Sequence, residues 1–180
     1  MKIACLLADG FEDIEALGTS ALLRRAGYQV DFFSVNGNDK VTGSYKTVVT
    51  DLLMMNWLLP HEYDALFIPG GRAAYFLREN EEVRKIVKEF HKLNKWLFSI
   101  CAGPTVFGML GLLENKKYIS FPGTEKEMGE QAIRVEKKAV SDGKIVTGKS
   151  AGAVYDFVFE IVKNVEGEEA LENLKKRMYY

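Results

Sequence analysis

Residues 96–105, Trp-Leu-Phe-Ser-Ile-Cys-Ala-Gly-Pro-Thr, constrain the fold of this chain more than any other stretch. Residues 96–100 form a short apolar run with aromatic and β-branched members, which is the composition of a buried strand. Cys101 follows directly, and Ala-Gly-Pro then allows a sharp turn into a segment with helical spacing from Thr105. A buried strand that turns sharply into a helix is typical of an α/β protein, and it places one side chain at the end of the sheet.

That side chain is the thiol of Cys101, which makes it a candidate nucleophile. The arrangement resembles the nucleophile elbow of hydrolases, although the Gly-x-Ser-x-Gly signature is absent. At a helix N-terminus, backbone N–H groups and the helix dipole favour the thiolate. Many cysteines are instead buried structural residues that behave as small hydrophobes. The position of Cys101 between a strand and a turn of small residues favours a reactive thiol.

The rest of the chain alternates short apolar runs with amphipathic segments. Strands are predicted at 2–8, 28–35, 64–68, 96–100 and 117–121, with a small hairpin or edge strand at 41–50 and a hairpin at 135–147 that turns at Ser141-Asp142-Gly143. Helices are predicted at 12–25, 81–94, from 105, at 150–164 and from 167, while 52–59 fits either a short helix or a covering loop. No linker or repeat divides residues 1–180, so the pattern predicts one α/β domain with a mostly parallel sheet covered on both faces.

In such a sheet the functional groups are expected at the carboxyl ends of the strands. Three strand ends carry suitable residues, at 9–15, 69–71 and 101–103. Gly70-Gly71 could be only a tight turn. Because glycine lets backbone N–H groups approach a ligand, the pair could also supply donors for an oxyanion.

Glu15 is the candidate acid at the first of these strand ends. A carboxylate in the first turns of a helix is usually solvated and complements the helix dipole, as Glu12 and Asp13 are expected to do. Glu15 differs because it lies between Ile14 and Ala16-Leu17, close to the buried stripe of the helix. A carboxyl group there is expected to have a raised pKa and to donate a proton.

Composition excludes several functional classes. The net charge of −1 gives no electrostatic footprint for nucleic acid, and no apolar stretch reaches the ~20 residues of a membrane span. The first residues lack the features of a signal peptide, and Cys5 and Cys101 look like a reduced pair, so we expect a cytoplasmic protein. His61 and His91 match no zinc-ligand spacing, so we expect no metal.

Residues 143–150, Gly-Lys-Ile-Val-Thr-Gly-Lys-Ser, formally fit the phosphate-binding pattern G-x-x-x-x-G-K-[ST]. That pattern requires a strand before the first glycine and a cradle-shaped loop between the two glycines. Here Asp142-Gly143 indicates a hairpin turn and residues 145–147 indicate a strand, which leaves no room for the cradle. The match therefore does not predict a nucleotide site.

Three segments together resemble a known family. Ala8-Asp-Gly-Phe-Glu-Asp-Ile-Glu15, Phe67-Ile-Pro-Gly-Gly71 and Ser99-Ile-Cys-Ala-Gly-Pro104 are similar to the ThiJ/PfpI superfamily, in particular to the branch with the parkinsonism-associated oxidative-stress protein. The resemblance extends over almost the whole chain. It implies a flavodoxin-like three-layer sandwich, a homodimer and no cofactor. It also implies that Cys101 is the reactive cysteine, that Glu15 hydrogen-bonds its sulfur, and that Gly71 and Ala102 supply the backbone donors.

The sequence departs from the family pattern at two positions. The protease-like branch has histidine directly after the cysteine, whereas this chain has Ala102, so a Cys-His peptidase is not expected. In the stress-protein branch a histidine commonly precedes a proline near the pocket, whereas here Phe121 precedes Pro122. No other histidine is placed to replace it, which argues against a proton relay through histidine.

Two functions follow from the resemblance and remain open at this point. The first is a cysteine-dependent stress-response protein that acts on small reactive carbonyls such as methylglyoxal, as a glyoxalase or deglycase without a cofactor. The second is a non-enzymatic redox sensor or chaperone-like protective protein that uses oxidation of Cys101. Both place the chemistry at Cys101 and Glu15.

Overall fold

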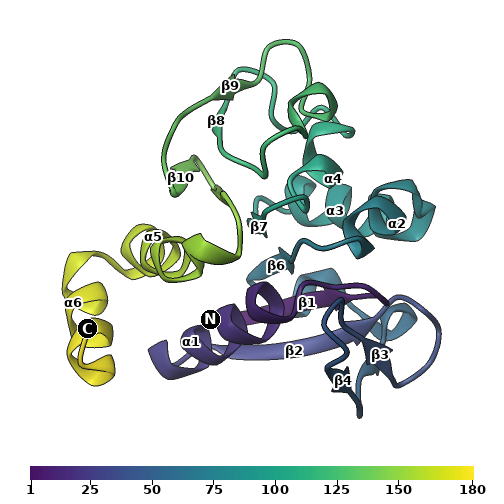
Figure 1. Ribbon diagram of the computed structural model, residues 1–180, viewed down its shortest axis with the longest axis horizontal. Helices are drawn as coiled ribbons and strands as arrows, with labels where there is room; N and C mark the ends of the chain where they lie inside the picture. The colour runs from purple at the N-terminus through teal and green to yellow at the C-terminus, as the bar shows by residue number, and fades with distance from the viewer.

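The computed structural model describes residues 1–180 and has a seven-stranded sheet at its centre (Figure 1). The sheet strands are β1 (Lys2–Leu7), β2 (Gln29–Ser34), β5 (Leu53–Met54), β6 (Ala65–Ile68), β7 (Trp96–Ile100), β10 (Ala139–Asp142) and β11 (Ile145–Gly148). Two short pairs lie outside it, β3 (Val41–Thr42) with β4 (Val48–Val49) and β8 (Lys117–Tyr118) with β9 (Ile133–Arg134). The α-helices are α1 (Thr19–Ala26), α2 (Ala73–Glu79), α3 (Glu81–Lys92), α4 (Thr105–Gly108), α5 (Val154–Glu166) and α6 (Glu168–Met178).

The sheet has the order β10-β11-β7-β6-β1-β2-β5. All its pairings are parallel except that of β10 with β11. The central strands are apolar because both of their faces are covered, and every residue of β6 is buried. This arrangement confirms the predicted α/β, flavodoxin-like fold with a mostly parallel sheet.

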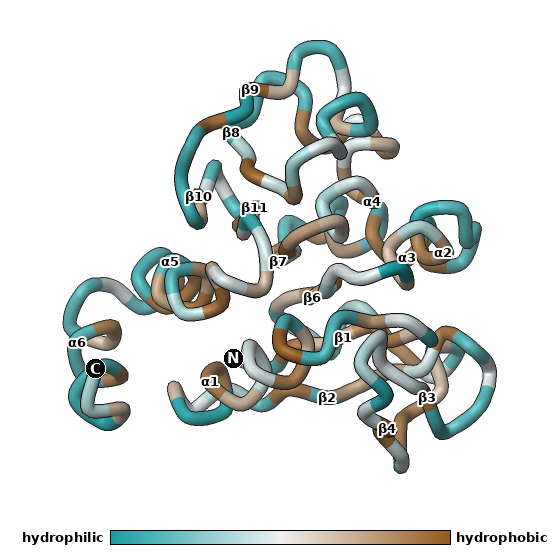
Figure 2. The backbone as a smooth tube through the Cα atoms, viewed as in Figure 1, coloured by the Kyte–Doolittle hydropathy of each residue, from teal (hydrophilic) through white to brown (hydrophobic).

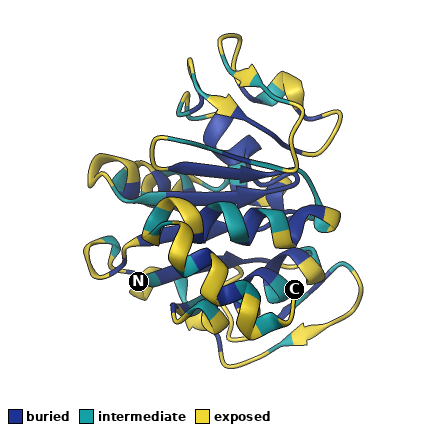
Figure 3. Cartoon of the chain, turned by 90° about the vertical axis from the view of Figure 1, so that its left-hand side faces the viewer, coloured by how far each residue is buried: buried dark blue, intermediate teal, exposed yellow.

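Helices cover the sheet on two sides. α1, α5 and α6 pack together on one side, and α2, α3 and α4 lie together on the other. Buried residues of the strands form the middle layer, and the exposed residues lie on the outer helices and loops (Figure 3). The backbone coloured by hydropathy shows the same division, with hydrophobic strands and a hydrophilic outer surface on α6 (Figure 2). None of the helices is long and apolar enough to cross a membrane.

The helix predicted at 12–25, the hairpin predicted at 135–147 and the helix predicted at 150–164 are present, with small differences in their bounds. The predicted helix at 12–25 begins instead as a π-helical turn, Ile14–Gly18, before α1, which ends at Gly27 in the left-handed region as expected. The hairpin at 135–147 is β10 and β11, so the phosphate-loop pattern at 143–150 is a turn and a strand. A short 3₁₀ turn, Ala151–Ala153, precedes α5.

The middle of the chain holds the larger corrections. The segment 52–59 is neither a helix nor only a loop, because β5 adds to the sheet edge and a 3₁₀ turn follows. The helix expected from 105 has four residues and then breaks into turns that include Gly111 with a positive φ. The strand predicted at 117–121 is shorter, since β8 has only two residues. α2 was not predicted, since seven residues give too little periodicity to stand out.

The β3–β4 hairpin is tied to the π-helical turn by Asp13. The Asp13 carboxylate accepts hydrogen bonds from the backbone N–H groups of Tyr45 (2.9 Å) and Thr47 (3.2 Å). A Cβ atom on Gly43 would lie 2.5 Å from this carboxylate, so only glycine fits there. Asp13 is therefore a structural residue and not the solvated carboxylate that the sequence suggests.

Asp13→Asn is expected to make the free energy of unfolding less dependent on pH in acid. Burial alone would raise the pKa of Asp13, but its hydrogen bonds to Thr47 and Tyr45 outweigh it and lower that pKa. A carboxyl with a lowered folded-state pKa stabilises the fold above its unfolded pKa of about 3.9, and this stabilisation is lost as pH falls through the folded value. Urea unfolding between about pH 5 and pH 2 should therefore show a smaller loss of free energy in Asp13→Asn than in wild type. Asp39→Asn, at an exposed loop position, is the control, and equal slopes in all three proteins would contradict the assignment.

Candidate active site

Three neighbouring strands of the sheet, β7, β6 and β1, end at one place. Cys101 follows β7, Gly70-Gly71 follows β6, and residues 8–13 follow β1. The last two segments are bonded directly, by a bridge between Phe11 and Gly71 and by the N–H of Glu12, which donates to the Gly70 carbonyl at 3.1 Å. The structure therefore brings together the three strand ends that the sequence singled out.

The backbone at Cys101 makes a sharp elbow. Its φ is +65°, in the left-handed region that non-glycine residues rarely adopt. The elbow is held on both sides, because the Cys101 N–H donates to the Gly148 carbonyl (2.9 Å) and its carbonyl accepts from Phe121 N–H (2.8 Å). A Cβ atom on Gly103 would lie 2.3 Å from the Ser99 hydroxyl, so the turn also requires glycine. Strain of this kind persists where the surroundings fix it, and such positions cluster at functional sites.

Glu15 lies beneath the elbow. Its side chain is 1% exposed and extends from the π-helical turn, a feature that is frequent at functional sites. The Gly70 N–H donates to Glu15 Oε2 at 3.0 Å, and Glu12 Oε2 accepts from the Glu15 N–H at 2.7 Å. A Cβ atom built on Gly70 would lie 2.4 Å from Glu15 Oε2 and 3.0 Å from Cys101 Sγ, so the carboxyl and the thiol lie beside each other. The prediction that Glu15 lies on the buried side of its helix is therefore correct.

The Glu15 carboxyl and the Cys101 thiol titrate as a pair. Burial raises the pKa of Glu15 to about 7; the hydrogen bond with Cys101 opposes this rise, and the charge of Glu12 reinforces it. Once Glu15 is ionised, burial and the charge of this carboxylate raise the pKa of the Cys101 thiol to about 12. Between these two values the pair holds one proton and one negative charge.

Backbone N–H groups influence both members of the pair. Those of Gly71 and Ala102 lower the pKa of the Cys101 thiol, and those of Gly70 and Ala151 lower the pKa of the Glu15 carboxyl. Gly71 and Ala102, the donors that the resemblance implies, line the same pocket as Cys101. The helix dipole expected at Cys101 is absent, because α4 begins only at Thr105 and has four residues.

The Cys101 side chain, 8% exposed, opens into a pocket of about 400 Å³. The pocket is lined by Glu12, Ser44, Tyr45, Gly71, Arg72, Tyr75, Cys101, Ala102 and Phe121. Sequence reasoning missed Tyr45, Arg72 and Tyr75. The last two belong to the start of the unpredicted α2, and the first to a hairpin turn whose neighbour in space is not visible in the sequence. No group of three or more His, Cys, Asp or Glu side chains gathers where it could hold a metal ion.

Comparisons with known proteins place these features in context. Residues 1–164 match the DJ-1/PfpI family. The chain is 32% identical over 164 residues to a protein named deglycase from Pyrococcus abyssi, with 91% of this chain and 98% of the relative covered. It is 33% identical over 166 residues to one from Thermococcus kodakarensis, with 91% and 98% covered.

Solved structures give the same result for the fold. Oxidised DJ-1 of Toxoplasma gondii superposes with a TM-score of 0.91 at 26% identity, covering 99% of this chain and 98% of that one. Drosophila melanogaster DJ-1beta superposes with a TM-score of 0.90 at 25% identity, covering 99% and 97%.

Gly70→Ala is expected to disrupt the site from its backbone. The new methyl group would lie 2.4 Å from Glu15 Oε2 and 2.5 Å from Cys101 Cβ, so both side chains must move. Overpacking of this kind costs about 1–3 kcal/mol, which urea unfolding measures. The pH midpoint of Cys101 alkylation should shift as well, because the methyl group separates the coupled pair.

The matched control is Gly152→Ala, since a Cβ atom there meets nothing within 4 Å. In wild type, limited iodoacetamide should modify Cys101 before Cys5, which is fully buried with a pKa raised far above its usual value, chiefly by burial. If Gly70→Ala had the unfolding free energy and the pH dependence of Cys101 alkylation of wild type, then Gly70 would not be tightly packed against Glu15 and Cys101.

Proposed function

The chain belongs to the DJ-1/PfpI family, and we propose that it is a cysteine-dependent stress-response protein that converts small reactive carbonyl compounds without a cofactor. The observation that carries this proposal is the buried Glu15 carboxyl beside Cys101, whose side chain lines a pocket of about 400 Å³. One shared proton gives the site a nucleophile and an acid at the same time. The deglycase names of the Pyrococcus and Thermococcus relatives support the same class of substrate.

Considered separately, a pKa of about 7 for Glu15 and of about 12 for Cys101 favour a charged carboxylate beside a neutral thiol. In the coupled pair we assign the shared proton to Glu15 instead. A thiol is a weak hydrogen-bond donor, whereas a protonated carboxyl is a strong one, so the pair forms its stronger hydrogen bond with the proton on oxygen. The negative charge then lies on sulfur, where the N–H groups of Gly71 and Ala102 also stabilise it. Sulfur is large and polarisable, which suits it to carry charge in a poorly hydrated site.

The reaction with a 2-oxoaldehyde then follows in three steps. The Cys101 thiolate attacks the aldehyde carbon, and the new alkoxide takes the proton from Glu15 to give a hemithioacetal. The Glu15 carboxylate next removes the hydrogen of that carbon as a proton and returns it to the neighbouring carbon, while the hydroxyl proton moves to the neighbouring oxygen. This converts the hemithioacetal into a thioester of a 2-hydroxy acid. Water hydrolyses the thioester and releases the acid and the thiol, so the sum is addition of one water with no oxidant. The N–H groups of Gly71 and Ala102 are placed to stabilise the oxyanions.

The site lacks the parts of a cysteine peptidase. Such enzymes activate the thiol with an adjacent histidine. Here Ala102 follows the nucleophile and Phe121 lines the pocket, so no imidazole lies among the pocket residues. Proton transfer is therefore assigned to Glu15 alone.

The second candidate is redox sensing, and one observation favours it. The groups that face Cys101 can all donate to an oxidised sulfur, since a sulfinate accepts hydrogen bonds from the same N–H groups and from protonated Glu15. A solved structure of Toxoplasma gondii DJ-1 is described as oxidised. In this case Cys101 is modified without turnover of any carbonyl.

Purified protein should form lactate from methylglyoxal, and Cys101→Ser should abolish this activity because the nucleophile is lost. Glu15→Gln keeps a donor to sulfur but cannot transfer a proton, so we expect a low thiol pKa with at least about a 100-fold loss of kcat. Glu15→Leu removes the donor too and should raise the thiol pKa. Absorbance at about 240 nm, where thiolates absorb, measures the thiol pKa. Lactate formation measures kcat.

Peroxide treatment followed by intact-mass measurement separates the two functions. Sulfinate on Cys101 in wild type and Glu15→Gln, with no lactate from either, would favour the sensor. If Glu15→Leu matched wild type in thiol pKa, turnover and sulfinate retention, then Glu15 would be an ordinary buried carboxyl and the proposed site would be wrong.

The protein is also proposed to form a homodimer through the helical segment that carries Glu15. Ile14 is 60% exposed although it adjoins the buried pair, and Leu17 and Leu22 are only partly covered. Sedimentation at micromolar concentration should give twice the 20.3 kDa of one chain, and Ile14→Glu should lower the association because it places a charge on the apolar face. A wild-type mass near 20.3 kDa would reject this proposal.

A further inference from the structure

The pocket over Cys101 has an aromatic mouth. Tyr45, Tyr75 and Phe121 line it and are each substantially exposed, and the same pocket reaches Cys101 between Gly71 and Ala102. The charged residues of the lining are one cation, Arg72, and one anion, Glu12, so the pocket selects no net charge. We therefore expect apolar contacts with the aromatic residues to distinguish one ligand from another.

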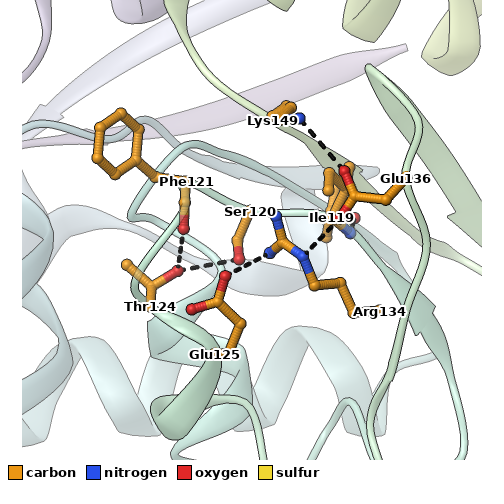
Figure 4. Close-up of polar contacts among 9 residues, drawn as sticks. Ile119, Ser120, Phe121, Thr124, Glu125, Arg134, Glu136 and Lys149 are labelled. Carbon is orange, nitrogen blue, oxygen red and sulfur yellow. Dashed lines mark hydrogen bonds and ion pairs between the residues drawn. The ribbon is translucent and has the colours of Figure 1, made fainter.

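The loop that carries Phe121 is firmly anchored. The Phe121 N–H donates to the Cys101 carbonyl, and the Thr124 hydroxyl donates to the Phe121 carbonyl at 2.7 Å. Further along, Arg134 pairs with Glu125 at 3.1 Å and with Glu136 at 3.0 Å. Figure 4 shows the contacts of Thr124 and Arg134, with the ring of Phe121 pointing away from them. The backbone at Phe121 is thus held in place, while the ring stays exposed at the pocket.

Tyr75 is fixed to the same loop from the other side. The Arg78 guanidinium lies 4.7 Å from the centre of the Tyr75 ring, and it pairs with Glu127 at 3.4 Å. Glu127 belongs to the 3₁₀ turn Glu125–Glu127, six residues after Phe121. A cation held against a ring restricts its orientation. The Tyr75 ring and the backbone that carries Phe121 are therefore positioned before any ligand arrives, which lowers the entropic cost of binding.

We propose that this mouth selects 2-oxoaldehydes with a planar aromatic substituent over methylglyoxal, with Phe121 as the residue that determines specificity. The inference rests on the proposed function, because it assigns the substituent of the carbonyl that Cys101 attacks. A flat ring offers its face or edge to Phe121 and Tyr75, whereas a methyl group is too small to reach them while its aldehyde is at the sulfur. The volume of about 400 Å³ leaves room for the ring.

The test compares phenylglyoxal with methylglyoxal by the ratio of their kcat/KM values. A group that fills an apolar pocket changes kcat/KM by roughly 10–200-fold, so wild type should favour phenylglyoxal at least about tenfold. Phe121→Ala should reduce the ratio by about the same factor, and Phe121→Tyr should restore it. Phe76→Ala is the matched control, because Phe76 and Phe121 are both phenylalanines with 48% exposure and Phe76 does not line the pocket.

A binding measurement tests selectivity independently of turnover. Mandelate and lactate are the hydroxy acids that correspond to the two substrates, and each is titrated for protection of Cys101 against iodoacetamide. Mandelate should protect wild type at about tenfold lower concentration than lactate, and Phe121→Ala should remove the difference. Lack of turnover together with selective protection rejects the proposed activity and keeps the aromatic selectivity. The inference is overturned if the two substrates have equal kcat/KM values, or if mandelate and lactate protect Cys101 at equal concentrations. It is also overturned if Phe76→Ala changes the kcat/KM ratio as much as Phe121→Ala does.

Discussion

The contact between the Glu15 carboxyl and the Cys101 thiol is the interaction on which the rest of the site depends. Two acids can lie together in a nearly dry place only if they share a proton, because burial and mutual repulsion oppose a second charge. Gly70 makes the contact possible, since any side chain there would occupy the space of both groups. The same backbone donates to the carboxyl. A glycine that looks like a turn residue is thus a part of the site.

The sheet supplies the rigidity that this contact needs. The elbow at Cys101 has an unfavourable φ, and the pairing of β7 with β11 and β6 holds it through the Gly148 carbonyl and the packing around Gly103. Strain at a functional residue is kept only where the surrounding structure over-determines it. The buried central strands therefore border a residue with a strained backbone. The reactive residue therefore lies at the ends of the strands that form the core.

The pocket mouth follows a different principle. Its aromatic residues come from a hairpin turn, a short helix and a long loop, and each of these segments is held by contacts with polar or charged side chains. Loops tolerate change better than strands because fewer buried contacts depend on them. The reactive pair can therefore stay constant while residues such as Phe121 alter which molecule reaches it.

The sequence alone determined the α/β class, the strand ends at 69–71 and 101–103, and the pairing of Glu15 with Cys101 by resemblance to a family, because short buried strands and glycine turns leave local signals. It did not reveal the π-helical turn, α2, or the roles of Asp13, Tyr75 and Arg78. Those depend on contacts between segments far apart in the chain, such as Asp13 with the turn at 43–47. The thiol environment also required the structure, since burial and a neighbouring charge act through space and a helix of four residues supplies little dipole.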